Sequence, residues 1–332
     1  MNKSIKNFVA TLSLGTAQKQ GRLRIRPILS TADFKLSILT LEEALEAGVL
    51  EISEVNDTGR VSTLRVFNSG NKPVVIFEGE ELIGAKQNRI VNKTVIIDAN
   101  SEVTIDVSCV ERGRWGYTST LFSASDISSG PRIRRVMHQS YSESVLRGGR
   151  GTADQGAIWN EIDRKMNRMN VASPTASAQD VSATILKQVA EYPGFDRNTP
   201  DNGKQFSKSD PQEANPREAD IQHIPGQIGY IAFIDDGLAS CDIYGSEEIF
   251  RLKFSKIKSG LMIDAHDHGL SFPLIEEQEI MESLGSFGSE FAEDGKGEIR
   301  FSRGNLSGTV KTLDGEFVHA ALFGKTDHES AP

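Results

Sequence analysis

The sequence has 332 residues, of which 38% are hydrophobic and 25% are charged, and its formal net charge is −9. These values are typical of a globular protein. No apolar stretch approaches the ~18–20 residues that cross a bilayer. Two cysteines, Cys109 and Cys241, are too few for a disulfide scaffold or a multi-cysteine zinc site. An acidic chain is also not expected to be a general nucleic-acid binder.

Residues 1–14 carry two lysines before a short apolar run that Thr11 and Ser13 interrupt. The run is too short for a secretory signal peptide and lacks a small-residue cleavage site. We therefore expect a first strand or an ordered tail here. We also expect a cytoplasmic protein with two reduced cysteines and with no membrane or nucleic-acid partner.

The next hundred residues predict short strands. Leu41–Gly48 fits a helix with Gly48 as its C-terminal cap. Polar turns then separate the apolar segments Val61–Phe67, Val74–Phe77, Ile90–Ile97 and Val103–Val110. Period-two alternation within the last segment places Val103, Ile105, Val107 and Cys109 on its core side. This spacing predicts a β-sandwich or jelly-roll-like N-terminal part within residues 1–150.

The middle and the end of the chain show patterns other than a series of short strands. After the break at Gly148–Gly151, residues 151–193 predict a helical insertion with helices at Ala153–Met169 and Ala178–Tyr192. Residues 194–220 predict a mobile loop. Residues 221–325 predict an α+β part that forms one compact unit with residues 1–150. Its expected elements are two hairpins with Asp-Gly turns and two helices, at Ile228–Tyr244, Gly304–Phe323, Ser246–Ser259 and Ile275–Ser286. The predicted class is strand-rich α+β.

Charge is distributed unevenly along the chain. Residues 84–150 hold ten basic and six acidic residues, a net of +4, which leaves 27 basic and 40 acidic residues elsewhere, a net of −13. A basic island would suit a phosphate-bearing ligand because Arg pairs with phosphate through two hydrogen bonds. A solvated face with surface ion pairs is the alternative.

Three carboxylates, Glu78, Glu80 and Glu81, follow the apolar strand at Val74–Phe77. Neighbouring carboxylates can share a proton or hold Mg²⁺, and Gly79 allows a ligand to approach the backbone closely. Glu111, at a strand end, would be the partner acid. The alternative is a polar turn with exposed acids.

The run Lys86–Arg89 could donate hydrogen bonds to phosphate, ribose or amide groups, although an edge or loop role is the alternative. Arg114 and Trp115 place a guanidinium beside a ring that could stack on a nucleobase. Trp115 as a core anchor is an equal alternative. Cys109 shares the parity of the core residues, so we expect a buried structural thiol rather than a nucleophile.

No metal site is predicted. The segment Asp264–His268 contains a His-x-His pair but no third ligand nearby, so a solvated loop is preferred. We expect His319, in an apolar strand, to be a core histidine with its hydrogen bonds satisfied. The phosphate-binding, dinucleotide-binding, nucleophile-elbow and zinc-protease motifs are all missing from the sequence.

Two runs, Gly79–Arg89 and Ser108–Trp115, look like family signatures. They resemble those of a bacterial family, the ARG and rhodanese-phosphatase-superfamily-associated proteins, where ARG means ADP-ribosylglycohydrolase. Trp159–Lys165, Val171–Thr175 and Pro225–Gly229 are also similar, and so is the last strand. The resemblance covers most of residues 35–325.

The resemblance implies a role around NAD or ADP-ribose metabolism without defining a reaction. At the positions of the shared motifs, the resemblance points to residues that we infer to form a site. The catalytic candidates are Glu80, Glu81 and Glu111. The ligand-binding candidates are Lys86, Gln87, Asn88, Arg89, Arg114, Trp115, Trp159, Lys165, Ser173, Thr175 and Gln227.

Three hypotheses follow. The chain could bind an ADP-ribose-like nucleotide, act on one as a hydrolase or transferase, or serve as a structural or interaction protein. In the enzymatic case Glu80 or Glu81 would be the general base or a ligand of Mg²⁺, the cofactor such carboxylates suit. Convergence of Glu80, Glu111 and Arg89 in one pocket would favour an enzyme, and closed salt bridges would favour a structural role. The sequence leaves homo-oligomer formation open.

Overall fold

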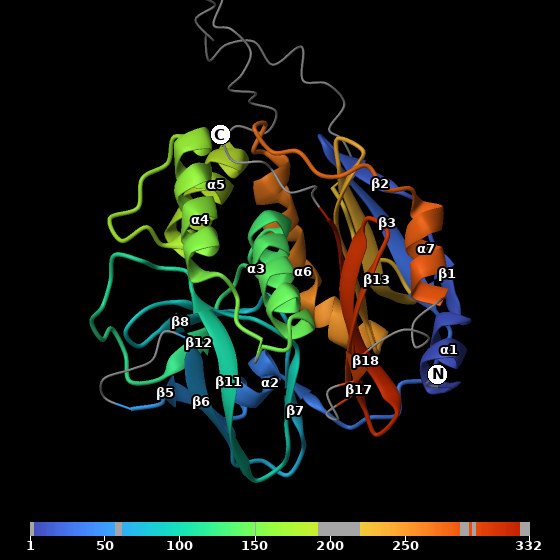
Figure 1. Ribbon diagram of the computed structural model, residues 1–332, viewed down its shortest axis with the longest axis horizontal. Helices are drawn as coiled ribbons and strands as arrows, with labels where there is room; N and C mark the ends of the chain where they lie inside the picture. The colour runs from blue at the N-terminus through green and yellow to red at the C-terminus, as the bar shows by residue number, and fades with distance from the viewer. Residues whose placement is uncertain are drawn as a thin grey trace, which may run out of the picture.

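The computed structural model describes residues 3–56, 62–149, 151–191, 220–285, 292–293 and 297–325. The loop predicted at residues 194–220 lies outside these ranges, except for Asp220. Several sheets and a set of helices make up the described parts, which confirms the predicted strand-rich α+β class (Figure 1). None of the described helices has the length and apolar character needed to cross a membrane.

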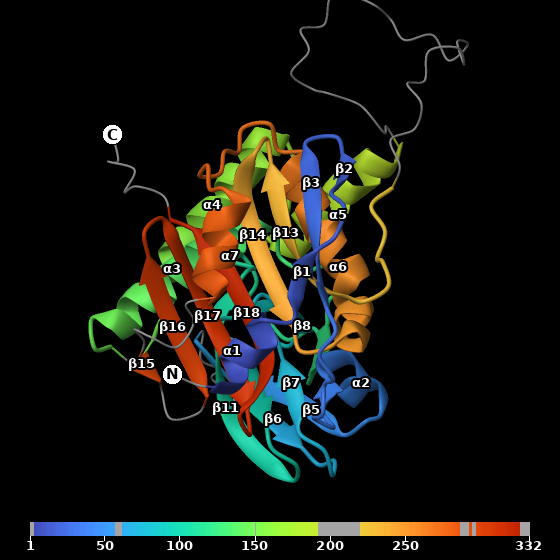
Figure 2. The same cartoon turned by 90° about the vertical axis from the view of Figure 1, so that its right-hand side faces the viewer.

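A nine-stranded antiparallel sheet forms one half of the molecule (Figures 1 and 2). Along the sheet its strands are β1 (Leu12–Leu14), β3 (Leu23–Ser30), β13 (Gln227–Ile234), β14 (Gly237–Tyr244), β18 (Glu316–Gly324), β17 (Leu306–Leu313), β16 (Glu298–Arg303) and β15 (Ala292–Glu293), with β2 (Gln18–Gln20) paired to β3. Because β3 pairs with β13 along its length, the first thirty residues share one sheet with the C-terminal strands.

Both faces of this large sheet are covered. Helices α1 (Lys3–Val9) and α7 (Glu277–Gly285) pack on one face, and α3 (Pro131–Leu146) and α6 (Glu247–Ala265) lie over the other (Figure 1). All residues of β13 and β14 are consequently buried. The strand or tail expected at the N-terminus is wrong for residues 3–9, which form a helix. Ile5 and Phe8 lie on the face of α1 that packs on the sheet. The Phe8 ring stacks on the Phe317 ring, with the two centroids 4.0 Å apart.

A smaller β unit lies at the lower end of Figure 1. Its three-stranded sheet contains β10 (Val95–Ile97), β7 (Val74–Ile76) and β4 (Leu39–Thr40). Its six-stranded sheet contains β12 (Phe122–Ala124), β8 (Glu81–Gly84), β9 (Arg89–Val91), β11 (Ser101–Cys109), β6 (Thr63–Asn68) and β5 (Leu50–Glu54). The two sheets enclose one apolar core, as the sandwich-like prediction requires. A capping box between Thr40 and Glu43 starts the short helix α2 (Leu41–Glu46).

Both predicted C-terminal hairpins are present. At the β17–β18 turn, Asp314 and Gly315 have φ values of 50° and 79°, the positive pair that a tight hairpin turn needs. The β13–β14 turn instead uses Asp235 and Asp236, with φ of 47° and 64°, and Gly237 begins β14. The expected Asp-Gly turn is therefore shifted by one residue there.

Helices α4 (Gln155–Met169) and α5 (Ala178–Glu191) fall where they were predicted. The Asp154 side chain accepts from Ala157 N and caps α4, while Ser177 accepts from Asp180 N at the start of α5. Helix α6 runs to Ala265, farther than predicted. Helix α3 was not predicted, because its buried side carries Arg134, Arg135 and His138 and so breaks the apolar stripe.

Candidate functional site

The two signature motifs meet around Glu111. Its carboxylate accepts hydrogen bonds from Arg114 Nε at 2.9 Å and Nη2 at 2.6 Å, from Thr175 Oγ1 at 2.9 Å and from the backbone N of Asn88 at 3.1 Å. Burial alone would raise the pKa of Glu111, but these bonds from Arg114, Asn88 and Thr175 hold it below its usual value. Glu111 is therefore an ionised anchor that joins three segments distant in sequence.

The other polar residues of the motifs form hydrogen bonds mainly with neighbouring backbone groups. Arg114 Nη1 donates to Ala85 O at 2.7 Å, and Gln87 Nε2 donates to Glu111 O at 2.9 Å. Asn88 Oδ1 accepts from Gly84 N and from Arg114 Nη2, each at 3.1 Å. We call Gln87, Asn88, Arg89, Glu111, Arg114 and Thr175 the Glu111 cluster. These contacts fix the turn between β8 and β9 against the loop that follows β11.

Arg89 is completely buried. Its Nη1 donates to the carbonyl and to the side-chain oxygen of Gln87, at 3.3 and 3.1 Å, and its Nη2 lies 3.5 Å from Glu54 Oε1. The thiol of Cys109 lies 3.2 Å from Gln87 Oε1 and is also wholly buried, as expected of a structural cysteine. Burial raises the pKa of Cys109.

The later motif residues are dispersed. Lys165 Nζ binds Asp264 Oδ1 at 2.5 Å, Ser173 Oγ donates to Asp180 at 3.0 Å, and Gln227 bridges backbone atoms of Ile224 and Gly229. Trp159 packs half-buried against the α3–α4 core.

The solvated loop predicted at Asp264–His268 is wrong for its two acids. Asp264 and Asp267 are wholly buried, because Lys165 and Arg168 of α4 pair with them. Across the ranges that the structure describes, no three His, Cys, Asp or Glu side chains come together as metal ligands.

An open groove of about 620 Å³ lies beside the Glu111 cluster. Its lining consists of Ser53, Glu54, Val55, Asn56, Arg65, Tyr117, Thr118, Ser119 and Thr120, and we call it the aromatic groove. Trp115 and Tyr117 are 52% and 53% exposed, so the alternative of Trp115 as a core anchor is wrong. The Lys86 ammonium lies 5.4 Å from the Trp115 ring and 5.1 Å from the Tyr117 ring, so it links the two rings by cation–π contacts.

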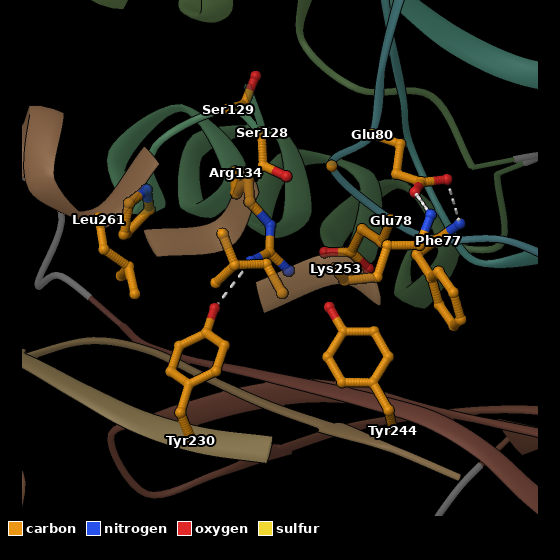
Figure 3. Close-up of a pocket in the computed structure, with 13 residues that line it drawn as sticks. Phe77, Glu78, Glu80, Ser128, Ser129, Arg134, Tyr230, Tyr244, Lys253 and Leu261 are labelled. Atoms are coloured by element: carbon orange, nitrogen blue, oxygen red, sulfur yellow. Dashed lines mark hydrogen bonds and ion pairs between the residues drawn. The ribbon is translucent and has the colours of Figure 1, made fainter. Parts of the chain in front are cut away.

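A second, smaller space of about 20 Å³ lies where the small β unit, the helices and the large sheet meet (Figure 3). We call it the junction cavity. Figure 3 shows Tyr230 and Tyr244 rising from the large sheet toward Arg134, with Glu78, Glu80 and Lys253 on the opposite side. The remaining lining residues are Phe77, Gly79, Ser128, Ser129, Pro131, Ile257 and Leu261.

Charged groups around the junction cavity are paired. Arg134 donates to both oxygens of Asp242, at 2.9 and 2.5 Å, and Tyr230 donates to Asp242 as well. Lys253 binds Glu80 and Glu42. Burial would lower the pKa of Lys253, but the two carboxylates raise it above its usual value.

Two histidines complete this network. His138 Nδ1 lies 3.1 Å from Glu78 Oε1, and His319 contacts Thr94 Oγ1 at 2.8 Å through Nδ1 and Asp242 at 3.4 Å through Nε2. Burial would raise the pKa of Glu78, but His138 and Arg134 hold it below its usual value. Sequence reasoning missed most of these residues, because they come from six helices and strands far apart in the chain. The one local signal is polar side chains such as Asp242 inside apolar strands.

Comparison with protein families matches residues 11–323 to the ARG and Rhodanese-Phosphatase-superfamily-associated Protein domain, ARPP-1. The chain belongs to the ARPP-1 family. Comparison with curated proteins and with solved structures found no match. The resemblance inferred from the two signature motifs is thus confirmed.

In this ARPP-1 chain the three candidate catalytic carboxylates do not converge. Glu80 borders the junction cavity, Glu111 lies in its own cluster, and Glu81 accepts a hydrogen bond from Ser129. Burial raises the pKa of Glu81 to about 7, against the lowering effect of Ser129. Arg89 and Glu111 do not line the junction cavity. Glu80, Glu111 and Arg89 each form an ion pair within the protein, the arrangement associated above with a structural role for these side chains.

Proposed function

We propose that this ARPP-1 chain binds a phosphate-bearing, NAD-derived ligand of the ADP-ribose class in the aromatic groove. The observation that carries the proposal is an exposed ring pair, of which Tyr117 lines the groove and Trp115 is linked to Tyr117 through the Lys86 ammonium that both rings contact. Two large rings held half-exposed offer a nucleobase a stacking surface.

The size of the groove supports a ligand of this kind. Its volume of about 620 Å³ lies within the range of roughly 300–1,000 Å³ found for small-molecule sites. Arg65, half exposed, lines the groove and offers a phosphate a counter-charge, since the acid that it pairs with, Glu102, is 4.0 Å away. The ARG in the family's name associates it with ADP-ribosylglycohydrolases, which supports ADP-ribose as the ligand class.

The Glu111 cluster has a positioning role in this proposal. Arg114 ties the loop after β11 to Gly84 and Ala85, and the two rings stand on that loop. Motif residues inferred from the sequence to touch ligand, such as Arg89 and Asn88, then act by holding the rings in place. Preorganised rings lose less side-chain entropy when a ligand binds.

The test is calorimetry with ADP-ribose, NAD and cyclic ADP-ribose, with and without Mg²⁺. Wild-type protein should bind at least one of them. Tyr117→Ala should weaken binding by about five-fold to 150-fold, since base–aromatic stacking is worth roughly 1–3 kcal/mol. Arg65→Gln should weaken it less.

Arg147→Gln is the matched control, because it removes one charge from an arginine that is 78% exposed and lies outside the groove lining. It should bind like wild type. If no ligand binds wild-type protein, or if Tyr117→Ala binds like the control, the proposal fails.

The enzymatic alternative has less support. Glu80 engages Lys253 with one oxygen and Phe77 N with the other, and Glu111 is ionised and fully hydrogen-bonded, so neither is free to take a proton from water. Mass spectrometry of the ligand after incubation separates the two. Recovery of unchanged ligand supports binding, and a Mg²⁺-dependent product would support the hydrolase or transferase.

A further inference from the structure

The two exposed rings stand on a loop that begins just after β11, and helices from elsewhere in the chain bind the end of that strand. We call Trp115–Leu121 the ring loop, and α4 and α5 with the connection between them the helical insertion. Helix α4 lies beside β11 (Figure 1). Because Val110–Arg114 join β11 to the ring loop, whatever holds this short segment sets where the ring loop starts.

Gln155 of α4 binds the last residue of β11. Cys109 N donates to Gln155 Oε1, and Gln155 Nε2 donates to Cys109 O, each at 2.7 Å. Strand β6 pairs with β11 only as far as Asp106. The Gln155 amide offers one acceptor and a donor, as a backbone residue does, so it takes the place of a neighbouring strand at Cys109.

The connection between α4 and α5 holds the residues that follow. Ala178 N donates to Val110 O at 2.8 Å, and Gly113 N donates to Thr175 O at 2.7 Å. Thr175 Oγ1 donates to Glu111 at 2.9 Å. A Cβ added at Gly113 would lie 2.8 Å from Thr175 Cα, so the two backbones are in direct contact there. The helical insertion thus binds the whole segment that leads to the ring loop.

The connection itself is held in one conformation. Ala176 N donates to Ser173 O at 3.2 Å and closes a turn, in which Pro174 occupies the position that its fixed φ favours. Ala176 has a φ of 50°, which a residue with a side chain rarely adopts unless its surroundings require it. The two ion pairs described above join α4 to the end of α6 and the residues after it. The helical insertion is therefore a rigid support for the segment that it binds.

We propose that the helical insertion positions the ring loop, with Thr175 as the positioning residue that acts through Glu111. The path is short, since Thr175 bonds Glu111 and Glu111 bonds Arg114, the residue before Trp115. The effect on ligand affinity rests on the proposed function, in which the ligand stacks on the rings of this loop. Because coupling between two events is reciprocal, a bound ligand also orders the contacts between the helical insertion and Gly113.

The first test follows Trp115 without any ligand. Protein labelled with 5-fluorotryptophan gives one ¹⁹F NMR signal for each of its two tryptophans, Trp115 and Trp159, and Trp115→Phe assigns them. Thr175→Val removes the hydroxyl and keeps the size of the side chain. In this variant the Trp115 signal should narrow and move toward its position in urea-unfolded protein, because the ring loop gains fast motion. Thr175→Ser keeps the hydroxyl and should restore the wild-type signal.

A second variant tests the same contact from the other side. Gly113→Ala places a methyl group against the backbone of Thr175, so it should displace the ring loop and change the Trp115 signal more than Thr175→Val does. Thr184→Val is the matched control, since the Thr184 hydroxyl bonds Asp180 O within α5, at 2.8 Å. It removes the same group from the helical insertion and should leave the Trp115 signal as in wild type.

The second test measures the consequence for binding, with ADP-ribose as the probe. Thr175→Val should weaken binding by about three-fold to ten-fold, the range of one hydrogen bond, whereas Thr175→Ser and Thr184→Val should bind like wild type. Bound ADP-ribose should also slow hydrogen exchange at the Gly113 and Ala178 amides, whose acceptors lie across this contact. Exchange that bound ADP-ribose leaves unchanged would overturn the reciprocal coupling.

A Trp115 signal that stays unchanged in both Thr175→Val and Gly113→Ala would overturn the proposal. A change in Thr184→Val as large as that in Thr175→Val would overturn it too, because any weakening of the helical insertion would then have the same effect. The fluorine measurement needs no ligand. It therefore decides the positioning role even if ADP-ribose fails to bind wild-type protein, a result that would count against the proposed function alone.

Discussion

Replacing Arg89 with methionine should destabilise the protein by about 3 kcal/mol. The substitution removes a guanidinium that is completely buried and leaves Glu54, 7% exposed, as an uncompensated carboxylate. Breaking a buried ion pair in this way costs roughly 3–5 kcal/mol. The lower end applies because the Arg89 Nη2 to Glu54 Oε1 distance is 3.5 Å, and because Glu54 Oε2 already has no hydrogen-bond partner.

Urea unfolding of wild type, Arg89→Met and Arg112→Met measures this difference. Arg112 pairs with Asp163 at 2.9 Å but its side chain is 48% exposed, so its loss should cost at most about 1 kcal/mol. Adding Glu54→Gln to Arg89→Met should restore part of the stability, since no buried charge is then unpaired. If Arg89→Met were as stable as Arg112→Met and yet lost ligand affinity, Arg89 would contact ligand directly, and its structural role would be refuted.

Three further predictions concern the carboxylates and Gly79. The folded pKa of Glu81 is raised to about 7 from 4.5, so its stabilising contribution is complete below pH 4.5 and is lost as the pH rises to about 7. Unfolding measured across that range should show a loss of roughly 3 kcal/mol that Glu81→Gln abolishes. The folded pKa of Glu111 is lowered, so its contribution is present above 4.5 and should decline as the pH falls below that value, a decline missing from acid-unfolding curves of Glu111→Gln. Gly79→Ala should lower the thermal midpoint, because φ is +87° and the new Cβ would lie 2.5 Å from Arg134 Nε; a midpoint equal to that of wild type would contradict the φ and the contact.

Local patterns predicted the elements whose partners lie close in sequence. The alternation along β11 correctly identified Ile105, Val107 and Cys109 as buried, because period two is a property of the strand itself. Helix α3 escaped prediction because its buried side carries Arg134 and His138, whose partners come from β14 and from the segment after β7. A polar side chain on a core face has no local signature when its counter-charge is about a hundred residues away, as Asp242 is from Arg134.

The same reasoning separates the parts of the candidate site that the sequence could identify. Trp115 was selected as a stacking ring, and the structure places it on the surface at 52% exposure. Arg89 was predicted to bind phosphate, but in the structure it is buried beside Glu54, which lies 35 residues earlier in the chain. Residue type alone indicates charge or aromaticity, whereas the side of the sheet that a residue faces depends on partners outside the motif.

The contrast between these two residues suggests how the signature motifs work. Their charged side chains are mostly buried and matched: Glu111 has three partners, and Arg114 bonds six backbone or side-chain groups in its own loop and in the β8–β9 turn. A network this complete rigidifies the loop, since losing one member leaves another buried charge unpaired. The groups left exposed, Trp115 and Tyr117, are the ones that a rigid loop would present to a ligand. A motif can therefore be rich in charge and still recognise its ligand mainly through the uncharged rings that the charges hold in place.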